Sequence, residues 1–232
     1  MYTYKRIYLN YQEDRKITPQ RAHYIARIHH WIESKMKIQD GTFDFLLPQE
    51  AFDASAIHWT PFSVIYEVLR ALNPSEETRL LDVGSGCGKF CIAAALLSPG
   101  LYTGVELRPW LHEAATTLKE ELGVLNVGFI QGDMADLDWS AYNTFYFYNP
   151  FHEQIVDEKV SGQQRIDYSI DFNVDTYLTY RRTVFEKLEA CPPGTKVVTY
   201  HGFGGILPEA YNLRICRKAG SGEVKLWVKS VE

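Results

Sequence analysis

The sequence has few of the features that mark secreted, membrane-bound or metal-binding proteins. Only four of its 232 residues are cysteines, and no two of them form a C-x-x-C pair. The apolar run Cys91–Leu97 is far shorter than the roughly 20 residues that cross a bilayer. The first ten residues mix polar and aromatic types and lack the apolar core of a signal peptide. We therefore expect a cytoplasmic protein with no membrane partner.

The cysteines give little support for a metal centre. Cys87 and Cys91 lie four residues apart, which predicts that they share one helix face, and two thiolates could hold a metal ion. No cluster of histidines or further cysteines completes such a site. We therefore expect no metal and two buried free thiols.

Charge is unevenly distributed along the chain. The net charge is −5, yet residues 1–37 hold eight Lys and Arg against three Asp and Glu, and the remainder holds 16 against 26. A basic segment beside an acidic body could attract RNA or an acidic protein. It could equally be a solvated helix face docked on that body, which is the interpretation we favour.

The N-terminal third predicts a small helical region. Thr18-Pro19 is typical of a helix start, and the apolar residues that follow recur at helical spacing, which predicts a helix over 19–37. Phe43–Phe52 reads as an irregular loop over the core, and Thr60-Pro61 as the start of a second amphipathic helix.

From Arg79 onward, short apolar runs alternate with helical stretches, which is typical of parallel strands joined by right-handed crossovers. The predicted strands are 79–83, 101–106, 127–131, 143–149 and 195–200, and the predicted helices are 88–98, 109–122 and 174–190. The C-terminal residues 212–231 predict a β-hairpin that turns at Ala219–Gly222.

The stretch Leu80–Phe90 is the most informative part of the chain. A strand that carries Asp82 leads through a G-x-G-x-G turn into a helix. Glycines tolerate positive φ and let a ligand approach the backbone, and the N–H groups of a helix N-terminus can hold a carboxylate or phosphate. The dinucleotide fingerprint G-x-G-x-x-G needs a third glycine where this chain has Lys89. With Asp82 beside it, the turn suits a ligand that carries an ammonium and a carboxylate better than a pyrophosphate.

Leu80–Phe90 resembles motif I of the class I S-adenosylmethionine-dependent methyltransferases. Tyr102–Leu107, Phe129–Met134 and Phe145–Phe151 resemble the later motifs of this family, in its order and spacing, over about residues 60–232. The resemblance implies an α/β fold, a Rossmann-like, mostly parallel seven-stranded sheet with an antiparallel C-terminal hairpin strand and an N-terminal helical cap. We expect an arm and cap over 1–57 and the methyltransferase domain over 58–232.

The resemblance also implies a cofactor site for S-adenosylmethionine, with S-adenosylhomocysteine as the product. Glu106 would bind the ribose hydroxyls and Asp133 would contact the adenine amino group. The expected cofactor-binding residues are Thr60, Asp82, Gly84, Ser85, Gly86, Gly88, Glu106, Leu107, Asp133, Met134 and Asn149.

Asn149, Pro150 and Phe151 are the expected catalytic residues. Amino-methyltransferases often carry Asp/Asn/Ser-Pro-Pro-aromatic here, whose side-chain oxygen and backbone carbonyl orient the acceptor amine. This chain has one proline instead of two, so either Phe151 or His152 takes the aromatic place. A turn without chemistry is the alternative interpretation. The segment His152–Asn173 that follows could be an acceptor-binding lid or a plain surface connection.

Three functions remain open at this stage. The first is methyl transfer to a nitrogen of a protein or RNA, which the basic N-terminal segment favours. The second is methylation of a small molecule, and the third is a non-catalytic nucleotide-binding module. Trp59-Thr60-Pro61 together with Val105–Trp110 is similar to Dot1-like lysine methyltransferases, which favours a protein amine as the acceptor.

Overall fold

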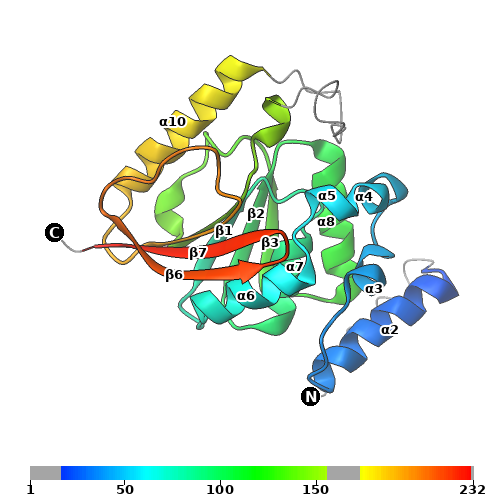
Figure 1. Cartoon of the computed structure of the whole chain (residues 1–232). Helices are drawn as coiled ribbons and strands as arrows, with labels where there is room; N and C mark the ends of the chain where they lie inside the picture. The colour runs from blue at the N-terminus through cyan, green and yellow to red at the C-terminus, as the bar shows by residue number, and fades with distance from the viewer. Residues whose placement is uncertain (1–16, 156–172, 231–232) are drawn as a thin grey trace.

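The computed structural model describes residues 17–155 and 173–230 (Figure 1). Its centre is a seven-stranded sheet in the order β3-β2-β1-β4-β5-β7-β6. The strands are β1 (Arg79–Val83), β2 (Leu101–Glu106), β3 (Val127–Gln131), β4 (Thr144–Tyr148), β5 (Lys196–Tyr200), β6 (Tyr211–Ala219) and β7 (Gly222–Lys229). The predicted α/β class and the hairpin are confirmed.

Strand direction determines where a ligand can bind. β1 to β5 are parallel, and β7 inserts antiparallel between β5 and β6, pairing Tyr200 with Val224. The chain runs outward from β1 to β3 and then returns to β4 on the other side of β1. In open sheets of this kind, ligands bind outside the carboxyl ends of the strands where the order reverses.

Helices cover both faces of the sheet because successive strand residues point to opposite sides. Leu80 belongs to the buried cluster under α6 (Phe62–Leu72), α7 (Lys89–Leu97) and α8 (Pro109–Leu122). Leu81 belongs to the cluster under α10 (Val174–Ala190). Two 3-10 turns, η1 (Trp139–Ala141) and η2 (His152–Gln154), flank β4. No helix in the described ranges is long and apolar enough to span a membrane.

The N-terminal cap consists of α2 (Pro19–Glu33), α3 (Asp40–Asp44), α4 (Gln49–Asp53) and α5 (Ser55–His58). Arg21 on α2 donates two hydrogen bonds to Glu121 of α8 at 2.8 and 2.9 Å, and Ile25, Ile28 and Trp31 are buried. The described part of the basic segment, α2, is therefore docked on the body of the protein, and Arg21 serves that docking.

Three local predictions in the cap region were wrong. The first helix ends at Glu33 instead of residue 37, because the chain turns left-handed at Lys35 (φ 55°). The region 43–52 is largely helical, since α3 and α4 occupy it. Thr60 does not cap α6 with its side chain, because its hydroxyl lies 3.0 Å from the Tyr146 hydroxyl. Residues 1–16 and 156–172, which include most of the candidate lid, lie outside the described residues.

Candidate active site

A cavity of about 480 Å³ opens at the carboxyl ends of β1 to β4, at the point where the strand order reverses. Nine of the predicted site residues line it: Gly84, Gly86, Glu106, Leu107, Asp133, Met134, Asn149, Pro150 and Phe151. The volume falls in the range of small-molecule and cofactor sites, about 300–1,000 Å³. The sheet edge therefore gathers most of the residues that the motifs indicated.

The glycine turn forms the floor of this cavity. Gly84 and Gly86 have φ of 75° and 55°, a region that side chains rarely adopt. A Cβ on Gly84 would lie 2.8 Å from Pro150 Cβ, and one on Gly86 would lie 2.4 Å from the Trp59 ring. Both positions require glycine, because a side chain there would collide with Pro150 or Trp59, which also line the cavity.

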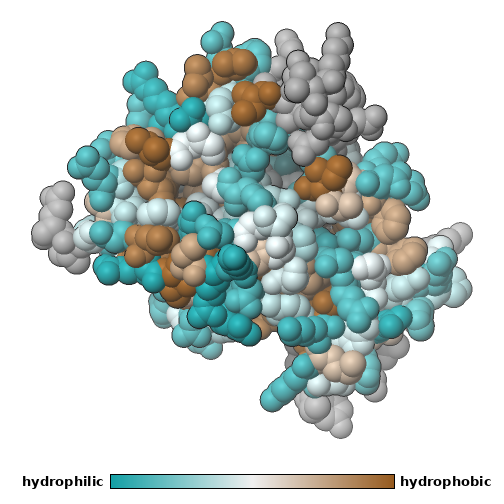
Figure 2. All heavy atoms as spheres, in the orientation of Figure 1, coloured by the Kyte–Doolittle hydropathy of each residue, from teal (hydrophilic) through white to brown (hydrophobic). Residues whose placement is uncertain are grey.

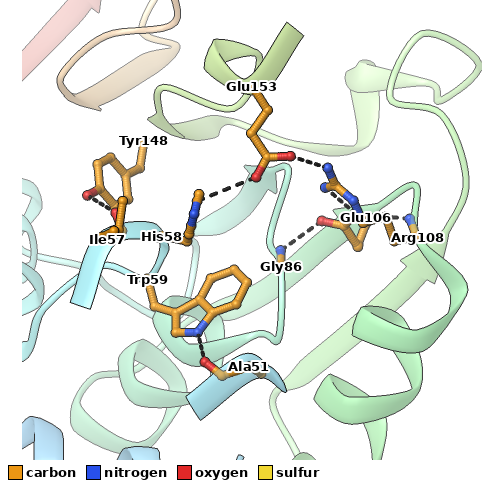
Figure 3. A network of polar contacts seen from close by, with 9 residues as sticks. All are labelled: Ala51, Ile57, His58, Trp59, Gly86, Glu106, Arg108, Tyr148 and Glu153. Atoms are coloured by element: carbon orange, nitrogen blue, oxygen red, sulfur yellow. Dashed lines mark hydrogen bonds and ion pairs between the residues drawn. The ribbon is translucent and has the colours of Figure 1, made fainter. Parts of the chain in front are cut away.

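Trp59 contributes one wall of the cavity from the end of the cap. Its ring is 6% exposed, and its indole N–H donates to the Ala51 carbonyl at 2.6 Å. Figure 3 shows His58 and Trp59 across the cavity from Glu106 and Arg108. The cap therefore belongs to the site, and the predicted boundary between residues 57 and 58 falls inside α5.

Glu106, at the end of β2, faces the glycine turn. Its two carboxylate oxygens accept hydrogen bonds from the backbone N–H of Gly86 and of Arg108, each at 2.9 Å. Burial raises the pKa of this carboxyl, and the Arg108 backbone and guanidinium oppose that rise. Each oxygen keeps one further lone pair, so the carboxylate can still accept two hydroxyl donors.

Asp133 lies one strand further along, after β3. Its carboxylate accepts from the Ala135 N–H at 2.8 Å and from the Tyr180 hydroxyl of α10 at 2.5 Å. Tyr180 also lines the cavity and packs against the Phe151 ring, with centroids 5.1 Å apart. Asp133 is thus fixed in orientation with accepting capacity left toward the cavity.

Asn149 follows β4 in a left-handed conformation with φ of 43°, which is uncommon outside glycine. Its backbone N–H donates to the Gly202 carbonyl at 2.7 Å, which joins the ends of β4 and β5. His201, at the end of β5, is also left-handed (φ 59°) and lines the same cavity. Phe151 is 5% exposed, packs in the buried cluster under α10 and also lines the cavity.

Four predicted cofactor residues do not line the cavity, and their contact with the cofactor stays a prediction. Thr60 is bonded to Tyr146, Ser85 is buried against Gly104, and Gly88 packs under Phe129. Asp82 points to the face that α7 covers, where the Cys91 thiol donates to it at 3.5 Å, and burial raises its pKa to about 7.

Cys87 and Cys91 are free and buried, as predicted. The described residues contain no group of three or more His, Cys, Asp or Glu side chains that could hold a metal ion.

Sequence reasoning missed two sets of residues. Lys89 is 2% exposed, and its ammonium pairs with Asp40 and Asp44 of the cap, each at 2.7 Å. Lys89 therefore fixes the cap to α7, and at the glycine turn only backbone groups remain to bind the ligand. The second set lines the cavity and comprises Arg108, Glu153 and Tyr180. Arg108, two residues after Glu106, is the one whose position next to predicted ligands could have indicated it.

The residues present fit S-adenosylmethionine. Glu106 and Asp133 keep free accepting capacity for hydroxyl and amino donors, and the glycine turn leaves its backbone close to the cavity. Both carboxylates are held by protein N–H or O–H donors, so they need no rearrangement to accept a ligand. When bound, this cofactor supplies an electrophilic methyl group.

Comparison with known proteins agrees with this geometry. Residues 74–174 match a family model described as a methyltransferase domain. An RNA methyltransferase from Salinibacter ruber, solved with S-adenosyl-L-homocysteine, is 24% identical, with a TM-score of 0.53 over 75% of this chain and 94% of that one. TrmN from Thermus thermophilus is 18% identical, with a TM-score of 0.52 over 75% of this chain and 55% of its own.

These two structures support the fold, and no curated protein matches the chain in sequence. The family match spans Gly84, Gly86, Glu106, Asp133 and Asn149, which all line the cavity. Residues 74–174 are therefore similar to a methyltransferase domain, and the cavity at their sheet edge fits S-adenosylmethionine.

Proposed function

We propose that the protein is an S-adenosylmethionine-dependent methyltransferase that transfers the methyl group to a nitrogen atom of an RNA or protein acceptor. The observation that carries this proposal is Asn149, which the left-handed turn after β4 places on the cavity wall. Its amide oxygen can accept an N–H of the acceptor and so direct the nitrogen lone pair. Such transfer depends on orientation more than on a strong base.

Two features support a macromolecular acceptor. Apolar side chains are exposed on α10 and on the loop after β5, including Leu178 at 51% and Ile206 at 75%. Figure 2 shows brown patches over α10 and the β6–β7 hairpin, whereas most of the remaining visible surface is hydrophilic. The similar fold in an enzyme named as an RNA methyltransferase adds support for RNA.

A small-molecule acceptor is the second candidate, because a second cavity of about 710 Å³ adjoins the first. The two share His201 and Ser221, and Phe203 and Trp227 give the second an aromatic lining. An aromatic pocket of this size could enclose a metabolite.

Three further expectations stay proposals. They are the division into an arm and a methyltransferase domain, a Dot1-like protein acceptor, and a cytoplasmic location.

The deciding experiment incubates the protein with methyl-labelled S-adenosylmethionine and fractionated cell extract. Label in RNA or in protein supports the proposal, and label only in small molecules favours the second candidate. An Asn149→Gly variant serves as the control for transfer that depends on the site. Calorimetric titration with S-adenosylhomocysteine and with NAD tests the cofactor assignment, and we expect heat only from the former.

A further inference from the structure

Glu153 bridges two walls of the cofactor cavity. It lies in η2, just after the candidate catalytic segment, and its side chain is 14% exposed. One carboxylate oxygen pairs with the Arg108 guanidinium, and the other lies 3.4 Å from His58 Nδ1 (Figure 3). All three residues line the cavity, although they come from the cap, from the start of α8 and from the turn after β4.

Arg108 in turn lies between two carboxylates. One guanidinium nitrogen contacts Glu153, and another lies 3.6 Å from Glu106, which also accepts the Arg108 backbone N–H. The Arg108 side chain is 10% exposed, so these interactions are poorly screened by solvent. Glu153 therefore draws part of the guanidinium away from Glu106.

This sharing matters for the ligand because a carboxylate offers a limited number of accepting positions. Without the charge of Glu153 on its other side, the Arg108 guanidinium would move toward Glu106 and form the bidentate pair that guanidinium and carboxylate groups favour. That pair would occupy the lone pairs that the ribose hydroxyls need. The other carboxylate oxygen of Glu153 lies near His58, the residue before Trp59, and so connects the cap to the turn after β4.

We propose that Glu153 is a positioning residue for the cofactor. It restrains Arg108 so that Glu106 stays available to the ribose, and it clasps the cap to the turn after β4 across the cavity. The inference rests on the proposed role of Glu106 as the ribose ligand. It assigns a binding function to a residue outside the four motifs.

The test measures binding to the full chain with and without Glu153→Gln, which keeps the shape and removes the charge. We expect S-adenosylhomocysteine to bind about tenfold more weakly, the scale of one charge-assisted hydrogen bond, and to dissociate faster. Adenosine, competing against labelled S-adenosylhomocysteine, should lose a similar factor. The analogue 2′,3′-dideoxyadenosine, which has no hydroxyl to offer Glu106, should bind both proteins equally.

Glu186→Gln is the matched control, because Glu186 pairs with Arg182 at 2.7 Å on the exposed side of α10. It should change none of these affinities. Equal binding of S-adenosylhomocysteine to the wild type and Glu153→Gln overturns the proposal, and so does an equal loss for all three ligands, which would indicate a merely structural role.

A wild type that fails to bind S-adenosylhomocysteine would instead overturn the cofactor assignment itself. If Glu153→Gln does not fold, Glu153→Asp replaces it. The side chain of that variant is one methylene shorter and cannot span both partners, so the same three ligands give the same decision.

Discussion

The two halves of the cavity are built differently. The cofactor edge, at the ends of β1 to β3, holds Gly86, Glu106 and Asp133 through protein hydrogen bonds of 2.5 to 2.9 Å. The acceptor edge, at the ends of β4 and β5, carries two left-handed residues, Asn149 and His201, and His201 is exposed. We infer that the first edge supplies affinity and the second supplies rate and acceptor choice, because strain is tolerated where function requires it.

The largest expected effect tests how firmly the cap is fixed over the cofactor edge. Lys89→Ala removes the cation from buried Asp44, whose pKa burial already raises, and should lower the free energy of unfolding by about 3–5 kcal/mol. Chemical denaturation measures it. Lys225→Ala breaks the exposed pair with Glu223 and should change stability by less than about 1 kcal/mol. Similar values for both variants would contradict a buried cap linkage.

Asn149→Ala tests the acceptor edge. Turnover on the labelled acceptor should fall about a hundredfold, because the acceptor nitrogen loses its orientation, whereas cofactor affinity should change little. Asn149→Gly also removes the amide but suits the left-handed backbone. Loss of turnover in both variants assigns the effect to the amide. Loss of turnover in the alanine variant alone would mean that Asn149 only shapes the turn and does not act through its amide.

Glu106→Ala tests the cofactor edge. It should weaken S-adenosylhomocysteine binding by about 1–3 kcal/mol, the scale for losing hydrogen bonds to a charged group. Isothermal titration measures the dissociation constant, and Glu113→Ala, on the exposed side of α8, is the control. An unchanged constant in folded Glu106→Ala would show that another residue holds the ribose.

The smallest expected effect concerns the orientation of Asp133. Tyr180→Phe keeps the ring beside Phe151 and removes the hydroxyl that donates to Asp133, so cofactor affinity should fall by about 1 kcal/mol. Tyr177→Phe, one turn earlier on α10, removes a hydroxyl 3.4 Å from the Gly204 carbonyl and should leave affinity unchanged. Equal affinities in the two variants would mean that Asp133 needs no support from α10.

The sequence by itself determined most of the secondary structure and the part of the site that lies within the motifs. β1, β2, β3, α8 and α10 have the predicted bounds, because apolar periodicity and turn residues act over a few neighbouring positions. The glycine turn and Glu106 were predicted because a strand, a turn and a helix start are contiguous in the chain. The orientation of Asp82 could also have been predicted, since Leu81 and Val83 point to the opposite face.

Only the tertiary structure decided which residues close the site. Glu153 meets Arg108 across 45 positions and His58 across 95, and Lys89 meets Asp40 across 49. Local periodicity carries no record of such pairs, because they depend on how the cap and the turn after β4 fold over the sheet edge. The cap helices α3 and α4 were missed for the same reason: each has five residues, and helices this short form only when tertiary contacts stabilise them.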